Sequence, residues 1–138
     1  MPVLATQHTT AGARAFAEFF IKTIDWGYAT TSSAYMRHYF TKTCIECLNA
    51  ARFLDNARMH KQHYLGGRIV IRSISGPIPG KIHDAAVSVP MQLDISSYEV
   101  VDRTGRVGNA GPANINYEEN VSLAEQPSGW RVVWLIGQ

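Results

Sequence analysis

The feature that most constrains the fold of this chain is one amphipathic stretch near its N-terminus, residues 13–28. Apolar side chains recur there at helical steps, which places them on one face of an α-helix. These residues are Ala13, Phe16, Ala17, Phe20, Ile21, Ile24 and Tyr28. The opposite face carries Arg14, Glu18, Lys22 and Asp25. A helix with so broad an apolar face needs a large concave partner, and we expect that partner to be a curved sheet from the second half of the chain.

Two further helices are expected in the first half. Residues 32–40 carry aromatic and aliphatic side chains at helical spacing and predict a short second helix. Residues 44–64 predict a third helix, which a glycine pair beginning at Gly66 would end. Thr43 and Glu46 stand at the spacing of a capping box, in which each side chain bonds the other's backbone N–H.

After the glycine pair the apolar period changes from that of a helix to that of a strand. The predicted strands cover residues 68–75, 86–100, 115–123 and 130–136. The alternation slips at Ser96 and Ser97, which indicates a bulge that bends the sheet. Residues 76–80 are expected to be a stiff connection and residues 102–111 a polar turn. Three helices followed by about four strands predict an α+β fold, with the helices packed on a bent antiparallel sheet.

Composition limits the classes of protein to consider. The chain has 138 residues, which suggests a loose N-terminal lead over residues 1–10 and a single domain over residues 11–138. A hydrophobic fraction of 46% and a charged fraction of 17% are typical of globular proteins. The net charge is only +2 and basic residues are scattered, so we expect no nucleic-acid partner. No apolar run reaches the roughly 18 residues that span a bilayer.

The order of elements resembles the nuclear-transport-factor-2-like, or cystatin-like cone, fold. Residues 12–16, 25–30 and 44–47 are also similar to an actinobacterial family of small envelope lipoproteins of unknown function. That family pairs a G-A-x-A-F opening with an N/D-x-x-Y-A-T helix end and a following C-x-x-C. The resemblance implies an extracytoplasmic protein that is membrane-anchored in the cell envelope through a lipid, and it supplies no catalytic residues.

The first ten residues lack the basic and apolar regions of a secretory signal peptide. If Met1 is the native start, the chain is expected to be cytoplasmic. The alternative is a targeting segment that precedes residue 1, as the resemblance implies.

Cys44 and Cys47 are the sharpest chemical feature. One helical turn apart, their Cα atoms would lie roughly 5–6 Å from each other, within the range for a disulfide. A structural disulfide of an exported protein is the favoured interpretation, beside a reactive redox pair at a helix N-terminus and two reduced core cysteines. A single cysteine pair is a weak indication of zinc.

The histidines do not favour a metal site. His60 and His63 lie close enough on a helix to share a metal, but we expect a solvated pair near the helix C-terminus. His38 and His83 are isolated and are expected at the surface. We therefore predict no metal and no cofactor.

A cone fold opens between its first helix and the sheet, where a small apolar ligand could bind. The candidate lining residues are Tyr28, Trp26, Tyr39, Tyr98, Tyr117, Glu119 and Trp134. Asp94 and Glu118 are further candidate acids, but Glu119 is the odd one, because it interrupts an apolar strand face. Aromatic residues at these spacings also fit a plain core.

Two functional hypotheses follow. The first is a non-enzymatic extracytoplasmic binding module, the soluble head of a small lipoprotein, whose partner is an unknown protein or envelope component. Contact with the membrane would then be only through the lipid anchor. The second is a small-molecule isomerase or dehydratase that uses the cone pocket. We expect no catalytic constellation; if there is one, it should be Glu119 with Tyr28 or Tyr117 in a dry pocket.

Overall fold

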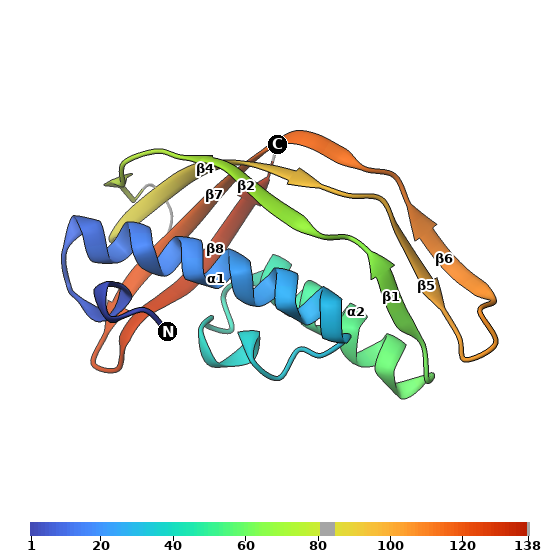
Figure 1. The fold of residues 1–138 in the computed structure, drawn as a ribbon. Helices are drawn as coiled ribbons and strands as arrows, with labels where there is room; N and C mark the ends of the chain where they lie inside the picture. Colours follow the sequence, from blue (N-terminus) through green and yellow to red (C-terminus); the bar gives the residue numbers. More distant parts are fainter. Residues whose placement is uncertain (81–84, 138) are drawn as a thin grey trace.

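The structure is a computed structural model that describes residues 1–80 and 85–137. It is a mixed α+β fold with antiparallel strand pairs (Figure 1). The helices are η1 (Val3–Thr6, 3-10), α1 (Thr10–Thr30), η2 (Met36–His38, 3-10) and α2 (Ile45–Met59). The strands are β1 (His63–Gly66), β2 (Ile69–Ile74), β3 (Ile78–Pro79), β4 (Val87–Ile95), β5 (Tyr98–Val101), β6 (Val107–Gly111), β7 (Asn114–Gln126) and β8 (Gly129–Gly137).

The strands form two sheets, and the chain segments that run through both lie in the same order in each. One sheet has the order β1-β5-β6, and the other has the order β2-β4-β7-β8 with β3 paired to β4. Because β1 runs into β2, β4 into β5 and β6 into β7, three long chain segments pass through both sheets. In Figure 1 the two sheets make an arch over the helices. Of the four strands predicted from the sequence, the one over residues 86–100 is divided by the bend into β4 and β5. The strands β3 and β6 lie where a connection and a turn were expected.

Backbone geometry at Gly66 and Gly67 makes the bend. Their φ angles are +77° and +67°, a left-handed conformation that favours glycine. A Cβ atom on Gly66 would stand 2.1 Å from the carbonyl oxygen of Ser97, so the neighbouring chain segment leaves no room for a side chain. Ser96 and Ser97 separate β4 from β5, at the phase slip seen in the sequence.

The helix count is a correction to the sequence analysis. Within the described residues there are two α-helices, not three, and the expected second helix is only the short η2. The reason is non-local, because the chain after η2 bonds to β8. The backbone N–H of Thr41 donates to the carbonyl of Val132 at 2.9 Å, and the N–H of Val132 donates to the carbonyl of Tyr39 at 2.9 Å.

The third predicted helix, α2, also ends earlier than expected. It stops at Met59, and Lys61 follows with a left-handed φ of +56°. His63–Gly66 then form β1, which pairs with β5. The glycine pair therefore bends the sheet instead of ending a helix.

The N-terminal lead also differs from the expectation of a loose segment. It contains η1, whose Ala5 is buried. The indole N–H of Trp130 donates to the carbonyl of Gln7 at 2.9 Å. Thr9 then caps α1, because its hydroxyl accepts the N–H of Gly12 at 2.9 Å.

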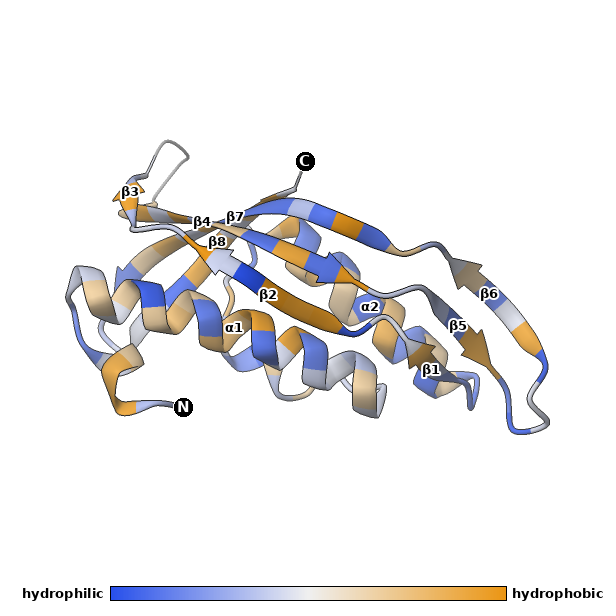
Figure 2. Ribbon diagram, turned by 45° about the horizontal axis from the view of Figure 1, so that its top comes forward, coloured by the Kyte–Doolittle hydropathy of each residue, from blue (hydrophilic) through white to orange (hydrophobic). Residues whose placement is uncertain are grey.

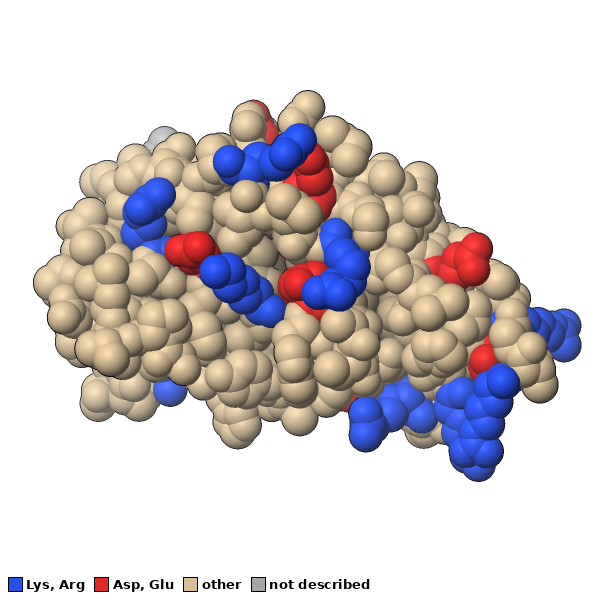
Figure 3. All heavy atoms as spheres, viewed as in Figure 1, with Lys and Arg blue, Asp and Glu red and all other residues tan. Residues whose placement is uncertain are grey.

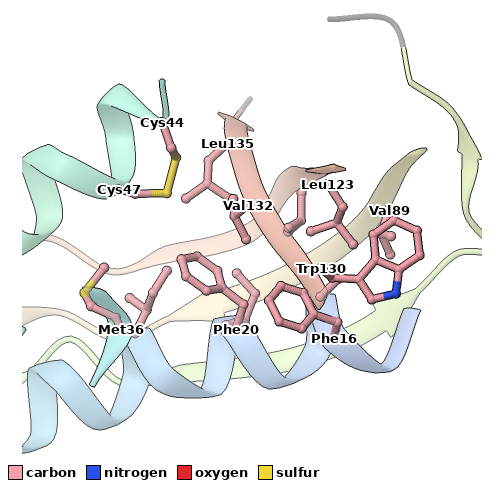
Figure 4. Close-up of a cluster of buried hydrophobic side chains, with 14 of the residues drawn as sticks. Phe16, Phe20, Met36, Cys44, Cys47, Val89, Leu123, Trp130, Val132 and Leu135 are labelled. Carbon is pink, nitrogen blue, oxygen red and sulfur yellow. A yellow bond between two sulfur atoms is a disulfide. The ribbon is translucent and has the colours of Figure 1, made fainter. Parts of the chain in front are cut away.

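The core lies between the apolar face of α1 and the main sheet. Figure 2 shows hydrophobic residues interleaved with hydrophilic ones along the strands, as expected for a sheet with one buried face. Phe16 and Phe20 are fully buried and point toward side chains of β7 and β8, including Leu123 and Val132 (Figure 4). The disulfide between Cys44 and Cys47 is present at the edge of this core, with Cα atoms 5.2 Å apart.

We predict that Phe20→Ala lowers the free energy of unfolding by about 3–5 kcal/mol, the usual cost of truncating a buried Phe. Urea denaturation followed by circular dichroism measures this. The control is Phe53→Ala, because Phe53 is 62% exposed and its loss should change stability by about 0.5 kcal/mol or less. A wild-type midpoint in the Phe20 variant would mean that α1 does not pack on the sheet.

Candidate ligand cavity

A cavity of about 490 Å³ lies at the bend, between the second half of α1, α2 and both sheets. Its apolar and aromatic lining comprises Ile24, Tyr28, Ala50, Phe53, Tyr64, Ile95, Tyr98 and Tyr117. Its polar lining comprises Glu46, Asn109, Asn114 and Glu119. No Lys, Arg or His lines it among the described residues. At the bend the sheet thus diverges from the helices, and both supply aromatic side chains to the space between them.

Three of the tyrosines form a connected group. The rings of Tyr28 and Tyr64 meet edge to face with centroids 5.0 Å apart, and the centroid of Tyr98 lies 5.8 Å from that of Tyr64. Burial, with smaller effects from Tyr28 and Tyr98, raises the pKa of Tyr64 to about 12. Burial also raises the pKa of Tyr28. The hydroxyls of Tyr28 and Tyr64 are therefore neutral at ordinary pH.

Two glycines make room for the other aromatic contacts. The hydroxyl of Tyr117 lies over Gly137, where an added Cβ atom would come within 1.4 Å of it. The ring of Tyr98 lies over Gly111, its partner across the β5–β6 pair, where an added Cβ atom would be 2.2 Å from the ring. Side chains at these glycines would push both rings out of place.

Glu119 is the most unusual polar group in the cavity. Glu119 is 9% exposed, and its buried Oε1 atom has no hydrogen-bond partner in the part of the chain that the structure describes. Burial, and then the negative charge of Glu46, raise the pKa of Glu119 to about 7, although the N–H of Asn120 acts in the opposite direction. Burial of Tyr117 itself, followed by the charges of Glu119 and Glu46, raises the pKa of Tyr117.

Glu46 reaches the cavity because the expected capping box does not form. The hydroxyl of Thr43 donates instead to the carbonyl of Val133 at 3.0 Å, and the cap residue of α2 is Cys44, which makes no side-chain cap bond. Glu46 is exposed in the first turn of α2 and also lines the cavity. The two carboxylates therefore lie at different depths, with Glu119 the buried one.

The structure brings four of the predicted pocket residues together and leaves three elsewhere. Tyr28, Tyr98, Tyr117 and Glu119 line the cavity. Trp26, Tyr39 and Trp134 do not. Sequence reasoning missed Tyr64 because it was assigned to a helix, and it missed Glu46 because of the capping-box pattern.

A bulge in β8 moves Trp134 away from the buried face of the strand. Ser122 pairs with Trp134 but Leu123 pairs with Val132, so Val133 is an extra residue. Beyond it the alternation reverses, and Leu135 takes the buried face in place of Trp134.

Trp26 and Tyr39 belong to an aromatic group outside the cavity. Trp26 is 46% exposed, and its ring lies edge to face with that of Tyr35 at 5.6 Å. The ring of Tyr39 meets those of Tyr35 and Phe19, with centroids 5.6 and 5.0 Å away.

The other candidate acids do not enter the cavity. Asp94 pairs with Arg72 at 2.6 Å and accepts the N–H of Asn116 at 3.0 Å. Glu118 is exposed, as expected for the residue beside Glu119 on a strand. Figure 3 shows that acidic and basic side chains lie next to one another on the face it presents, without a broad field of one sign.

The histidines give no metal site in the described ranges. Within residues 1–80 and 85–137, no group of three or more His, Cys, Asp or Glu residues could hold a metal ion. His38, His60 and His63 are exposed. His83 lies outside the described residues. Among the described helices, none combines the length and apolar character needed to cross a membrane.

The fold and the cavity define a small α+β domain in which helices cover one face of a bent antiparallel sheet over a partly aromatic cavity. No family model matches the chain, and no curated protein matches it. It is similar in structure to the intermembrane space region of the chloroplast protein ARC6, with a TM-score of 0.57, 8% identity and 96% of each chain covered. It also matches a periplasmic fragment of TraM with a TM-score of 0.48 and 15% identity, covering 96% of this chain and 98% of that one. At 8% identity the likeness to ARC6 concerns the fold alone.

We predict that Glu119 makes stability depend on pH. Its folded-state pKa of about 7 exceeds the ordinary value of 4.5, so burial of the carboxylate destabilises the fold as it ionises. This penalty is absent below the ordinary pKa, grows as pH rises toward 7 and is constant above it, on the order of 3 kcal/mol. Urea unfolding at pH 5 and pH 8 should show Glu119→Gln to be more stable than wild type chiefly at pH 8.

The matched control is Glu118→Gln, which removes the neighbouring exposed carboxylate. It should follow wild type at both pH values. An equal effect of the two substitutions would contradict the burial of Glu119.

Proposed function

We propose that this domain is a non-enzymatic extracytoplasmic binding module, the soluble head of a small lipoprotein, and that it holds a small ligand in the cavity at the bend. The observation that carries the proposal is the cavity itself. Its volume of about 490 Å³ lies in the range of small-molecule sites. Like such sites, it combines an aromatic lining with few polar groups.

Three further points support the location and the type of protein. A disulfide such as Cys44–Cys47 persists in oxidising compartments outside the cytoplasm. The fold occurs in an intermembrane space region, that of ARC6. The motifs at residues 12–16, 25–30 and 44–47 resemble those of envelope lipoproteins. The exposed Trp26 beside Tyr35 supports a contact with a protein or envelope component.

We predict that filling the cavity weakens ligand binding. Ala50 lines the cavity from α2, so Ala50→Phe places a benzyl group in the space that a ligand would occupy. The probe is the neutral dye N-phenyl-1-naphthylamine, whose fluorescence rises in an apolar site. Its affinity should fall by about tenfold or more, a loss of about 1.4 kcal/mol or more.

Asn49→Phe is the matched control, because Asn49 is exposed on the same helix and does not line the cavity. It should bind the dye as wild type does. Circular dichroism checks that both variants are folded. A wild-type protein that does not bind the dye, or equal binding by both variants, would count against the proposal.

One observation favours a second candidate function, an enzyme that transfers protons. A buried carboxylate with a pKa of about 7 is suited to general acid–base catalysis near neutral pH. Glu119 has this property and shares the cavity with Tyr117 and Tyr28, the residues expected for such chemistry. Glu119 would take a proton from the substrate, and a tyrosine hydroxyl would donate a hydrogen bond to the developing anion.

The second candidate predicts base catalysis on an activated carbon acid. The probe is 5-nitrobenzisoxazole, which opens to a coloured phenolate when a base removes its ring proton. The rate should rise with pH through about 7 as Glu119 ionises. It should be lost in Glu119→Gln and kept in Glu118→Gln. Equal rates in the two variants would remove the support for an enzyme.

A further inference from the structure

The cavity at the bend carries negative charge that no basic side chain in the described residues balances. Both Glu46 and Glu119 line it, and its lining contains no Lys, Arg or His. Other carboxylates of the domain are paired, for example Asp25 with Arg68 at 2.8 Å and Asp55 with Arg37 at 2.6 Å. Neither Glu46 nor Glu119 takes part in an ion pair among the described residues. Glu46 and Glu119 therefore share one cavity without a basic partner in its described lining.

Of the two glutamates, Glu119 is the more buried. Glu119 is 9% exposed and lines the cavity, and its Oε1 atom has no hydrogen-bond partner among residues 1–80 and 85–137. Buried polar atoms in folded proteins nearly always have partners, so an orphaned carboxylate oxygen needs a reason. A ligand that supplies a positive charge or an N–H donor would complete it.

The aromatic lining also favours a positively charged ligand. The ring of Tyr64 contacts those of Tyr28 and Tyr98, and Tyr117 belongs to the same lining as Glu119. The faces of aromatic rings attract cations, and desolvated rings do so more strongly than exposed ones. Aromatic rings and a carboxylate in one cavity lining form the kind of surface that recognises ammonium groups.

We propose that the ligand of this cavity is a free organic cation, an amine or quaternary ammonium compound, whose charge lies between Glu119 and the tyrosine rings. The inference rests on the proposed binding function and names its ligand class. A phosphate-bearing headgroup fits less well, because no basic side chain of the lining could pair with the phosphate.

The charge of Glu119 sets the pH dependence of binding. The titratable groups that line the cavity with it are Tyr28 from α1, Glu46 from α2, Tyr64 from β1, Tyr98 from β5 and Tyr117 from β7. Burial raises the pKa of Glu119 to about 7, so the charge of this group changes near neutral pH. A cation binds the ionised form, and its affinity should rise as pH passes through about 7.

The test compares choline with its neutral isostere 3,3-dimethylbutan-1-ol by isothermal titration calorimetry at pH 8. The two differ in charge but hardly in shape. We expect choline to bind wild type at least about tenfold more tightly than the alcohol, a difference of 1.4 kcal/mol. Glu119→Gln should remove the preference, and Glu118→Gln should keep it. Phosphocholine should bind more weakly than choline.

A second pair of variants tests the rings. Tyr64→Phe keeps an aromatic face and should retain the preference for choline, whereas Tyr64→Leu should reduce it. Equal affinities of wild type for choline and the alcohol, failure of both to bind, or tighter binding of phosphocholine would overturn the assignment to a free cation. If N-phenyl-1-naphthylamine still binds in that case, the cavity remains a binding site for a neutral ligand. If the dye does not bind either, the proposed function fails as well.

Discussion

The bend of the sheet is the constraint on which the other features depend. Gly66 and Gly67 adopt left-handed conformations there, and Ser97 packs against the first of them too closely for any side chain. Three chain segments turn together at this line, so the main sheet covers the core while the smaller one continues past it. A straight sheet would lie directly on the second half of α1. The bend instead leaves the space that Tyr28, Tyr98 and Tyr117 line.

The hydrophobic core on one side of the bend stabilises a fold that also contains the less favourable cavity on the other side. The core around Phe16 and Phe20 consists of buried apolar side chains, whereas the cavity contains a buried carboxylate whose ionisation opposes folding. Two contacts hold α1 at this boundary. The Asp25 carboxylate accepts two hydrogen bonds from the Arg68 guanidinium at 2.8 Å and one from the N–H of Ile69 at 2.9 Å. These bonds join the helix to the first residue of β2 and to the residue before it.

Local patterns were readable from the sequence, and contacts distant in sequence were not. The apolar stripe of α1 and the slip before Tyr98 are properties of neighbouring residues, and both appear in the structure. The loss of the second helix depends on hydrogen bonds to Val132, some ninety residues away. The displacement of Trp134 from the buried face depends on a register shift between β7 and β8. In the cavity, Glu119 was detectable because it broke an apolar alternation. Glu46 was hidden, because its spacing from Thr43 matched a cap that does not form.

The packing of the N-terminus determines how the domain would sit on a tether. The segment before α1 lies against β8, where the indole of Trp130 holds the carbonyl of Gln7. From there α1 runs from Thr10 to Tyr28, a distance of about 27 Å, before it reaches the cavity. A lipid-bearing segment joined ahead of Met1 would therefore hold the molecule by one end. The tyrosine-lined opening would then stand away from the bilayer surface, where it could sample dissolved molecules rather than membrane lipids.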